Sequence, residues 1–529
     1  MKANSILTRM QEGNTPVSIL GYGVSNKPLV EWLLSHGVPA ARLTVRDKRK
    51  PEELDASGEA GYLRSLGVAM VCGAGYLTGL CGADIIFRTP GIRPDLPDIA
   101  EAVSNGAYLT SEMELFRELT EATVLGITGS DGKTTSTTVT SLLVEEYLRR
   151  RGYGRMYLGG NIGMPLLPLV DGMTAADVAV LELSSFQLMT MHHSPTRAAI
   201  ANLSPNHLNW HLDMAEYLAA KANILLHMDT ADPLCGAVLN AENPETRRLG
   251  VTLPPDVPIV WFSSVASDWG QTVPPERQGD GFLDRAVFVA GNYIRIAGQQ
   301  GGLDLLEVSR IRLPGRHNLE NFMTALALCD RLIPPALLAS CAGTVADRFS
   351  GVAHRLELVA ESGGVRFYNS SIDSSPTRTC AALAALAELR GRQGAAGQPA
   401  HKPTVICGGQ DKHLSFAPLA EALCREAASV ILTGEAREQI RAALEACPIF
   451  DPTRLPVRVI PDWNEAMETA CREAVPGDTV LLSPACTSFD AFHNFAERGE
   501  RFRKIVHRVT DVEQEQYEKK GIDGKYDTE

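Results

Sequence analysis

The chain has 529 residues, of which 44% are hydrophobic and 21% charged, and its formal net charge is −13. A chain of this length can form several domains with buried cores, and its composition is that of a globular protein. Acidic residues outnumber basic ones by 63 to 50, which argues against non-specific nucleic-acid binding, because that needs an excess of positive charge. Anionic ligands must therefore be bound by local positive groups.

The cysteines and the hydrophobic segments bear on the cellular compartment. The 11 cysteines show neither a CxxC pair nor the spacing of a metal site, which indicates free thiols in a reducing compartment. The first residues, MKANSILTRMQEGN, lack the apolar core of a signal peptide, and no stretch reaches the roughly eighteen apolar residues of a membrane span. We expect a cytoplasmic protein that binds neither nucleic acid nor membranes.

Strand and helix signals alternate along the chain, which predicts an α/β fold with parallel sheets. Strands are expected in PVSILGYGVSN, ARLTVRDKR, ADIIFRTPGI, DVAVLELSS, RAAIANLSP, GVRFYNSS, TVICGGQD, SVILTGE and DTVLLSPAC. The predicted segments are domains at 1–121, 122–350 and 351–510 and a poorly ordered acidic tail at 511–529. The elements of 251–303 stay unassigned, and 391–403 is expected to be a flexible surface loop.

The most informative stretch is VLGITGSDGKTTST, from Val124 to Thr137. An apolar strand enters a glycine turn, and Lys-Thr-Thr opens a helix, which is the layout of a phosphate-binding loop. Lys133 would reach the terminal phosphates of a nucleotide, and the hydroxyl of Thr134 could bind Mg²⁺. The strict Walker pattern has glycine where Ile127 stands, so this is a variant loop. An ordinary strand–turn–helix corner is the alternative.

A second glycine turn, GYGVSN, follows the first predicted strand at Gly21–Asn26. It has two glycines of the dinucleotide fingerprint, but Asn26 replaces the third, and Asp47 lies at a suitable distance for a ribose contact. Taken alone, the turn is compatible with a nicotinamide cofactor, with the diphosphate of a uridine nucleotide, or with no ligand.

Three further residues of the central domain could serve a metal or a phosphate. Glu182 ends the strand of LELSSFQL, where a carboxylate could hold Mg²⁺ beside Thr134, although the serines after it could simply cap a helix. His207 in NLSPNHLNWH could bind a metal or a phosphate, or be structural. Lys221 would ordinarily be a solvated lysine, and it could bind a metal only if carbamylated by CO₂ into an anion.

Four more motifs lie later in the chain. HNLEN at His317–Asn321 and HRLE at His354–Glu357 could contact a nucleotide, or could be helix caps and surface charges. GGQDKH and SPACTSFDAFHNFAERG follow strands of the last domain. There Lys412, Ser488 and nearby backbone N–H groups could bind a carboxylate.

Taken together, these motifs resemble the Mur ligase family. The order is diagnostic: GxGxS, GITGSxGKTT, GGNIG, LELSSFQL, NHLxxH…K, HNxxN and HR, over residues 17–505. Within the family, LELSSFQL and SPACTSFDAFHNFAERG resemble the members that attach D-glutamate to UDP-N-acetylmuramoyl-L-alanine. The Asp-Asn-Pro-Arg motif of the members that add a diamino acid is absent.

The resemblance implies a Rossmann-like N-terminal uridine-nucleotide domain, a central ATPase domain similar to P-loop ATPases, and a Rossmann-like C-terminal domain for the incoming amino acid. It implies an ATP-dependent ligase of peptidoglycan precursor synthesis, with Mg²⁺, an acyl-phosphate intermediate and a monomeric state. The implied catalytic residues are Lys133, Glu182, His207 and Lys221, and the implied metal ligands are Thr134, Glu182, His207 and carbamylated Lys221.

The resemblance also implies three sets of binding residues. Those for ATP are Gly129, Ser130, Asp131, Gly132, Lys133, Thr134, Thr135, Asn318, Asn321 and Arg355. Those for the uridine-nucleotide substrate are Ser25, Asp47, Lys48, Arg49, Thr89, Asn161 and His207. Those for D-glutamate are Lys412, Ser488 and Phe495.

The chain departs from the family pattern at two places. The family often has an aspartate and a lysine where YNSSIDSSP has Ser370 and Ile372, and the segment Asn206–Trp210 lacks the acidic residues of DHxDR. The alternatives are a ligase of the folylpolyglutamate synthase type or another family member with a different amino acid, a nicotinamide-dependent oxidoreductase, and a non-catalytic nucleotide-binding regulator. Residues 1–121 argue against the folylpolyglutamate synthase type, which lacks such an N-terminal domain, while a family member with a different amino acid stays open. The broken dinucleotide fingerprint and the phosphate loop argue against the oxidoreductase. The retained Lys133, Glu182, His207 and Lys221 argue against the regulator.

Overall fold

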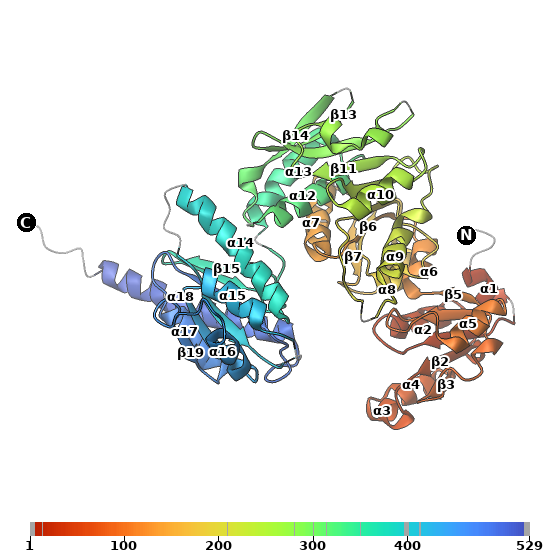
Figure 1. Cartoon of the computed structure of the whole chain (residues 1–529). Helices are drawn as coiled ribbons and strands as arrows, with labels where there is room; N and C mark the ends of the chain where they lie inside the picture. The colour runs from red at the N-terminus through yellow and green to blue at the C-terminus, as the bar shows by residue number, and fades with distance from the viewer. Residues whose placement is uncertain are drawn as a thin grey trace, which may run out of the picture. The chain divides into compact units, whose positions relative to one another are not determined.

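The computed structural model describes residues 6–12, 14–208, 210–279, 281–299, 301–313, 315–349, 351–395, 401–411 and 414–522 (Figure 1). Its internal contacts divide the chain into two compact units. The first comprises Met1–Arg310 with Leu319–Asp347, and the second comprises Ile311–Asn318 with Arg348–Glu529. Both units are α/β, as predicted, and the sheets fall within the ranges expected for three domains.

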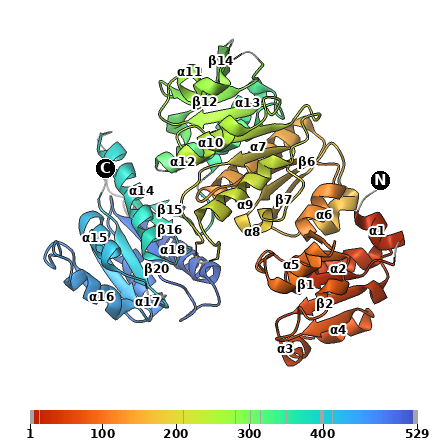
Figure 2. The same ribbon diagram turned by 45° about the vertical axis from the view of Figure 1, so that its right-hand side comes forward.

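The first sheet is parallel and has the strand order β3-β2-β1-β4-β5. Its strands are β1 (Val17–Leu20), β2 (Leu43–Asp47), β3 (Ala69–Cys72), β4 (Ile85–Arg88) and β5 (Tyr108–Thr110). The accompanying helices, several of them labelled in Figure 2, are α1 (Ile6–Glu12), α2 (Asn26–Ser35), α3 (Pro51–Ala56), α4 (Glu59–Ser65) and α5 (Pro97–Ser104). Strand order reverses at β1, and ligands of such sheets bind beyond the carboxyl ends of the strands at that point.

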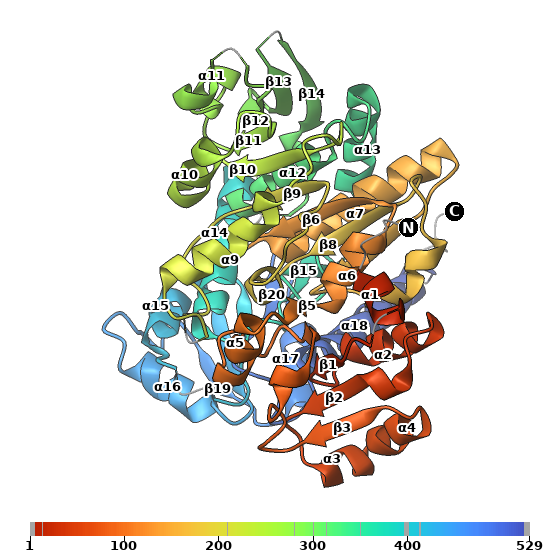
Figure 3. The same ribbon diagram turned by 90° about the vertical axis from the view of Figure 1, so that its right-hand side faces the viewer.

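The central sheet has the order β14-β13-β12-β11-β10-β9-β6-β8-β7, and several of its strands lie side by side in Figure 3. The strands are β6 (Thr123–Thr128), β7 (Met156–Gly160), β8 (Val178–Glu182), β9 (Arg197–Ile200), β10 (Gly236–Asn240), β11 (Ile259–Ser263), β12 (Arg285–Ala290), β13 (Tyr293–Gly298) and β14 (Gly301–Glu307). The helices are α6 (Glu112–Leu119), α7 (Lys133–Arg151), α8 (Ser185–Leu188), α9 (Met214–Leu226), α10 (Pro244–Thr252), α11 (Trp269–Thr272), α12 (Arg316–Cys329) and α13 (Pro335–Arg348).

The unassigned stretch 251–303 turns out to extend the central sheet. Strand β12 pairs with β13, and β13 with β14, in antiparallel fashion. A buried polar cluster holds the stretch together, since Asp284 accepts hydrogen bonds from Trp261 Nε1 at 2.8 Å and from Arg277 Nε at 3.0 Å. Arg277 and Trp261 lie 7 and 23 residues from Asp284, so the periodicity of a single helix or strand does not predict the arrangement.

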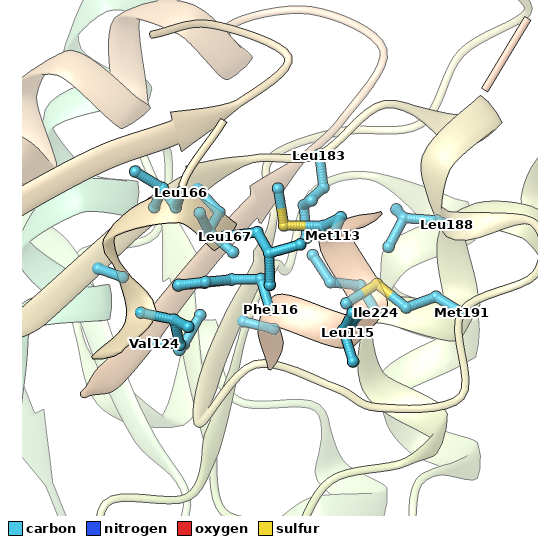
Figure 4. Packing of buried hydrophobic residues seen from close by; sticks show 14 of the residues in the cluster. Met113, Leu115, Phe116, Val124, Leu166, Leu167, Leu183, Leu188, Met191 and Ile224 are labelled. Carbon is cyan, nitrogen blue, oxygen red and sulfur yellow. The ribbon is translucent and has the colours of Figure 1, made fainter. Parts of the chain in front are cut away.

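Helix α6 joins the first sheet to the central one. The hydroxyl of Ser111 accepts a hydrogen bond from the N–H of Glu114 at 3.2 Å, which caps the helix. Its apolar side chains lie among residues from the central sheet and its loops, as Figure 4 shows for Met113, Leu115, Phe116, Leu166, Leu167, Leu183 and Leu188. One hydrophobic cluster contains buried side chains of both sheets, which explains why they form a single compact unit.

The second unit contains a sheet with the order β15-β16-β20-β17-β18-β19, parallel except for β15. The strands are β15 (Glu357–Ser362), β16 (Val365–Asn369), β17 (Thr404–Gly408), β18 (Ser429–Thr433), β19 (Val457–Val459) and β20 (Thr479–Ala485). The helices are α14 (Pro376–Ala395), α15 (Ala417–Glu426), α16 (Arg437–Glu445), α17 (Trp463–Arg472) and α18 (Phe495–Ile522).

Two helices extend into segments for which the sequence predicted no helix. Helix α14 continues to Ala395, into the stretch 391–403 that was expected to be a flexible loop, and residues 396–400 lie outside the described residues. Helix α18 extends to Ile522, where a poorly ordered acidic tail was expected from 511, and residues 523–529 lie outside the described residues. None of the described helices is both long and apolar enough to cross a membrane.

Candidate active site

The predicted phosphate-binding loop joins β6 to α7, at the carboxyl end of the central sheet. Gly132 caps α7 with a left-handed φ of 77°, and Lys133 is the first helical residue. The Lys133 amine donates to the carbonyls of Gly129 at 2.8 Å and Ser130 at 3.1 Å. The loop is tied to the segment after β9, because the N–H of Asp131 donates to the Asn202 side chain at 2.9 Å. Thr134 and Thr135 follow in the first turn of α7.

Glu182 ends β8, next to β6 and β7 in the sheet. The Asn161 side chain, just after β7, donates to Glu182 Oε1 at 2.8 Å. Glu182 is 1% exposed, and its Oε2 is a buried atom without a hydrogen-bond partner in the described part of the chain. An orphaned carboxylate oxygen beside a phosphate-binding loop fits a hard cation such as Mg²⁺.

Lys221 reaches the same loop from α9. Its amine donates to Gly129 O at 2.8 Å and to Thr128 Oγ1 at 3.1 Å, and the side chain is almost completely buried. Burial, and after it the positive charge of Lys133, lowers the pKa of Lys221 well below its ordinary value. A lowered pKa increases the share of the neutral, nucleophilic amine, which is the form that reacts with CO₂, so this environment suits the carbamylation expected from the sequence.

His207 lies in the segment that follows β9. It is exposed, has a left-handed φ of 55°, and its ring lies 5.1 Å from that of Phe186 on α8. Phe186 comes four residues after Glu182. The helix α8 that follows Glu182 therefore contacts the ring of His207, the other predicted catalytic residue in this region. Asn209 of the same segment lies outside the described residues.

Sequence reasoning missed His211, whose side chain is fully buried. Its Nε2 lies 2.9 Å from Ser185 Oγ and its Nδ1 lies 3.1 Å from Glu216 Oε2. Glu216 also accepts a hydrogen bond from Arg93 of the first sheet's domain at 2.7 Å. The spacing of four between the histidines of NHLNWH was the only available signal. The network connects the His207 segment to α8, to α9 and to the domain of the first sheet.

Asn321, predicted to bind ATP, lies on α12 beside the phosphate loop. Its Oδ1 accepts from Ser136 Oγ at 3.2 Å and lies 2.3 Å from where a Cβ on Gly132 would be. Residue 132 must therefore be glycine for steric reasons as well as for its backbone angle. Asn318, one turn earlier on α12, is also buried.

Five of the residues predicted for the uridine-nucleotide substrate lie at the carboxyl ends of β1, β2 and β4, whereas the other two, Asn161 and His207, follow β7 and β9 of the central sheet. Ser25 precedes α2, and Thr89 contacts the turn at Gly21, where a Cβ would lie 2.7 Å from its Cγ2. The Asp47 carboxylate accepts from the N–H of Tyr22 at 2.7 Å and from Arg49 Nε at 3.0 Å. Burial alone would raise the pKa of Asp47, but these hydrogen bonds lower it. Lys48 lies between Asp47 and Arg49.

In the second unit, Arg355 lies in a loop before β15, and Ser488 is buried in the loop after β20. Phe495 opens α18, is 40% exposed, and lies 5.9 Å from the His354 ring. Lys412 lies outside the described residues. Sequence reasoning missed Arg498, which donates to Thr487 O, Cys486 O and Ser371 O at 2.9–3.0 Å and so joins the loops after β16 and β20.

The set expected to hold a metal is chemically mixed. It consists of a hydroxyl, a carboxylate, an imidazole and a lysine, from Thr134, Glu182, His207 and Lys221. The described residues contain no group of three or more His, Cys, Asp and Glu side chains placed to bind a metal. A site built here thus depends on Glu182 and on modification of Lys221 rather than on a carboxylate cluster.

Comparison with known proteins identifies related chains. The Mur ligase middle domain matches residues 127–329, and the Mur ligase glutamate ligase domain matches residues 354–486. The UDP-N-acetylmuramoylalanine–D-glutamate ligase of Ruminiclostridium cellulolyticum is 38% identical over 499 residues, 94% of this chain and 97% of that protein. The ligase of the same name from Clostridium kluyveri is 39% identical over 494 residues, 93% of this chain and 96% of that protein.

Solved structures share the fold. The UDP-N-acetylmuramate–alanine ligase of Thermotoga maritima aligns with a TM-score of 0.51 at 18% identity, over 94% of this chain and 99% of that one. The UDP-N-acetylmuramoyl-L-alanyl-D-glutamate–2,6-diaminopimelate ligase aligns with a TM-score of 0.50 at 18% identity, over 80% and 92% of the two chains. With relatives of this identity along nearly its whole length, the chain belongs to the Mur ligase family.

Proposed function

We propose that this protein is an ATP-dependent ligase that attaches D-glutamate to UDP-N-acetylmuramoyl-L-alanine in the synthesis of peptidoglycan precursors. The observation that carries the proposal is the arrangement of Lys133, Glu182 and Lys221 around one phosphate-binding loop. Curated relatives named for this reaction, matched over 94% of the chain, support the choice of substrates.

We propose that Thr134 and Glu182 hold one Mg²⁺, and that His207 and carbamylated Lys221 hold a second. When bound, Mg²⁺ would offset the negative charge of the phosphate groups. The open oxygen of Glu182 and the depressed pKa of Lys221 support this assignment. As an ammonium group Lys221 would repel a cation, whereas its carbamate would bring a negative charge and oxygen ligands.

The reaction must join an amine to a carboxylate, which is a poor electrophile. In the proposed mechanism the alanyl carboxylate takes the γ-phosphoryl group of ATP, which yields an acyl phosphate and ADP. The amine of D-glutamate then attacks the carbonyl carbon of the acyl phosphate. The C–O bond to phosphate breaks, and phosphate leaves as the amide forms. Lys133 neutralises charge on the transferring phosphoryl group, and the loop N–H groups orient it.

We propose the remaining sites from the family resemblance together with the contacts described above. ATP is contacted by the loop residues Gly129–Thr135 and by Asn318, Asn321 and Arg355. The uridine nucleotide and its sugar are contacted by Ser25, Asp47, Lys48, Arg49, Thr89, Asn161 and His207. D-Glutamate is contacted by Lys412, Ser488 and Phe495. We also propose that the protein is cytoplasmic and monomeric.

Phosphate release from ATP tests the function. The full chain is supplied with Mg²⁺ and UDP-N-acetylmuramoyl-L-alanine, and D-glutamate, L-glutamate and L-lysine are tested separately. We expect release with D-glutamate alone, together with an amide product of matching mass. Release with another amino acid would keep the ligase and refute the substrate, while no release with any of them would favour a non-catalytic regulator.

A further inference from the structure

The loop that carries Arg355 has an unusual backbone. His354 and Leu356, on either side of Arg355, have φ angles of 67° and 44°. Bulky side chains rarely adopt this left-handed region, and such a conformation persists only where the surrounding structure imposes it. The contacts that impose it therefore determine how Arg355 is presented.

One contact holds the backbone directly after Arg355. The N–H of Leu356 donates to the hydroxyl of Ser370 at 3.0 Å in a buried setting. Ser370 follows β16, is 2% exposed, and donates its own N–H to Leu482 O of β20 at 2.8 Å. This hydroxyl thus ties the backbone after Arg355 to the segment that follows β16, beside a second bond there from Ile372 N–H to His354 O at 3.1 Å.

Asp373 lies next to that hydroxyl. The N–H of Asp373 donates to Ser370 O at 2.9 Å, which closes a tight turn. The Asp373 carboxylate accepts a hydrogen bond from the Ser483 hydroxyl at 2.8 Å, and the nearby hydroxyls of Ser370 and Ser483 lower its pKa. Asp373 is 5% exposed, and burial raises its pKa. A carboxyl group this deeply buried is costly, and nothing in the proposed mechanism requires it.

A separate set of contacts holds the other side of the loop. His354 donates its N–H to Glu357 Oε2 at 2.9 Å, and its Nδ1 lies 3.2 Å from the Asn369 side chain. A Cβ on Gly499 would lie 2.1 Å from His354 Nδ1, so the ring packs directly on the backbone of α18. The loop is therefore held at both ends, with Arg355 between the two.

We propose that Ser370 and Asp373 act as one positioning unit, which holds the Arg355 loop in its left-handed conformation and so sets the position of the guanidinium. This inference rests on the ATP-binding role proposed for Arg355. Family members often have an aspartate where Ser370 stands, and an aspartate there could accept the Leu356 N–H directly. In this chain the carboxylate comes from Asp373 and acts through the Ser370 hydroxyl.

Four variants test the positioning unit through steady-state kinetics. S370A and D373A should each raise the KM for ATP about tenfold, the effect of losing one well-made buried hydrogen bond. The KM for UDP-N-acetylmuramoyl-L-alanine should not change. The double variant S370A/D373A should be no worse than either single variant, because both break the same chain of contacts. S370D/D373A, which moves the carboxylate to the family position, should recover most of the ATP affinity.

Amide hydrogen exchange of the full-length protein supplies a readout that does not depend on turnover. Exchange in the peptide spanning 352–358 should be faster in S370A and D373A than in the wild type. T510A is the matched control, because it removes another buried hydroxyl of the same unit, bonded to Val506 O at 3.0 Å on α18. T510A should change neither the exchange rate of the peptide spanning 352–358 nor the KM for ATP.

The outcomes separate this inference from the proposed function. An unchanged KM for ATP in the single variants, unchanged exchange of 352–358, or a failure of S370D/D373A to improve on D373A would each overturn the positioning unit. Failure of the proposed function would appear in the wild type itself, as absent amide product with D-glutamate, while the exchange result would still report on the loop.

Discussion

The side chain of Asn161 donates to Glu182 Oε1 at 2.8 Å, while the N–H of Asn161 donates to the carbonyl of Glu182 at 2.7 Å. These two bonds join the loop after β7 to the end of β8. They also determine which carboxylate oxygen stays open, since Oε2 has no partner among the described residues. Asn161 therefore orients Glu182 in addition to the substrate contact proposed for it.

The first prediction concerns the charge of Glu182. Glu182→Gln keeps the size and can still accept from Asn161, but it removes the negative charge. We expect kcat to fall at least about hundredfold, as for the loss of one strong electrostatic contact in an active site. The midpoint of thermal unfolding should stay near that of the wild type. A variant with near-wild-type kcat at saturating Mg²⁺ would refute the metal assignment.

The second prediction separates the two lysines at the loop. Lys133→Ala should abolish turnover, because it removes the positive charge proposed to stabilise the transferring phosphoryl group. Lys221→Ala should be inactive but partly rescued by a small carboxylate such as formate or acetate, which can occupy the place of the carbamate. Kinetics with and without the added carboxylate measure this. Full activity of Lys221→Ala without rescue would refute carbamylation.

The third prediction uses the steric contact between Gly132 and Asn321. Gly132→Ala should destabilise the protein by about 1–2 kcal/mol through its left-handed backbone, and further through the clash with Asn321. Gly152→Ala is a matched control, because Gly152 ends the same helix with φ 82° and has no atom within 4 Å of a Cβ. Urea unfolding measures both variants.

The control decides how this result is interpreted. Gly152→Ala should show the backbone cost alone. Adding Asn321→Ala to Gly132→Ala should recover part of the excess loss, because it removes the clashing oxygen. Equal losses in Gly132→Ala and Gly152→Ala would mean that the contact with Asn321 is unimportant.

The fourth prediction concerns Glu112, a buried residue of α6 whose Oε1 accepts from Leu167 N–H at 3.2 Å. Burial raises its pKa from 4.5 to about 7. The folded protein thus keeps this proton longer than the unfolded chain, so this group's contribution to stability falls as pH rises from about 4.5 to about 7. Above that range the loss in the free energy of unfolding caused by ionised Glu112 stays constant, at about 3 kcal/mol.

Glu112→Gln removes the titration and keeps an acceptor for Leu167. The variant should match the wild type near pH 4.5 and exceed its stability at pH 8. Urea unfolding at several pH values measures the difference between the two proteins. A difference that does not vary with pH would show that Glu112 titrates near its ordinary value.

Much of the fold was predictable from local pattern. The expected strands in the uninterrupted apolar runs, such as DVAVLELSS and TVICGGQD, are present as β8 and β17. The runs are apolar on both faces because parallel sheets covered by helices are buried on both sides. The stretch 251–303 was not predictable, because β12, β13 and β14 are held by pairing between segments and by the buried Asp284.

By itself, the sequence determined the strand, glycine turn and helix of the loop proposed to bind phosphate, since Gly129–Lys133 are consecutive and need only one strand and one helix to be placed. It also determined the family, through the order of its motifs. Only the tertiary structure decided that Lys221 is buried against Thr128, that Asn321 lies on Gly132, and that the Ser370 hydroxyl holds the backbone directly after Arg355. These contacts join side chains from different elements, so burial and hydrogen bonding become defined only when the sheets and helices pack.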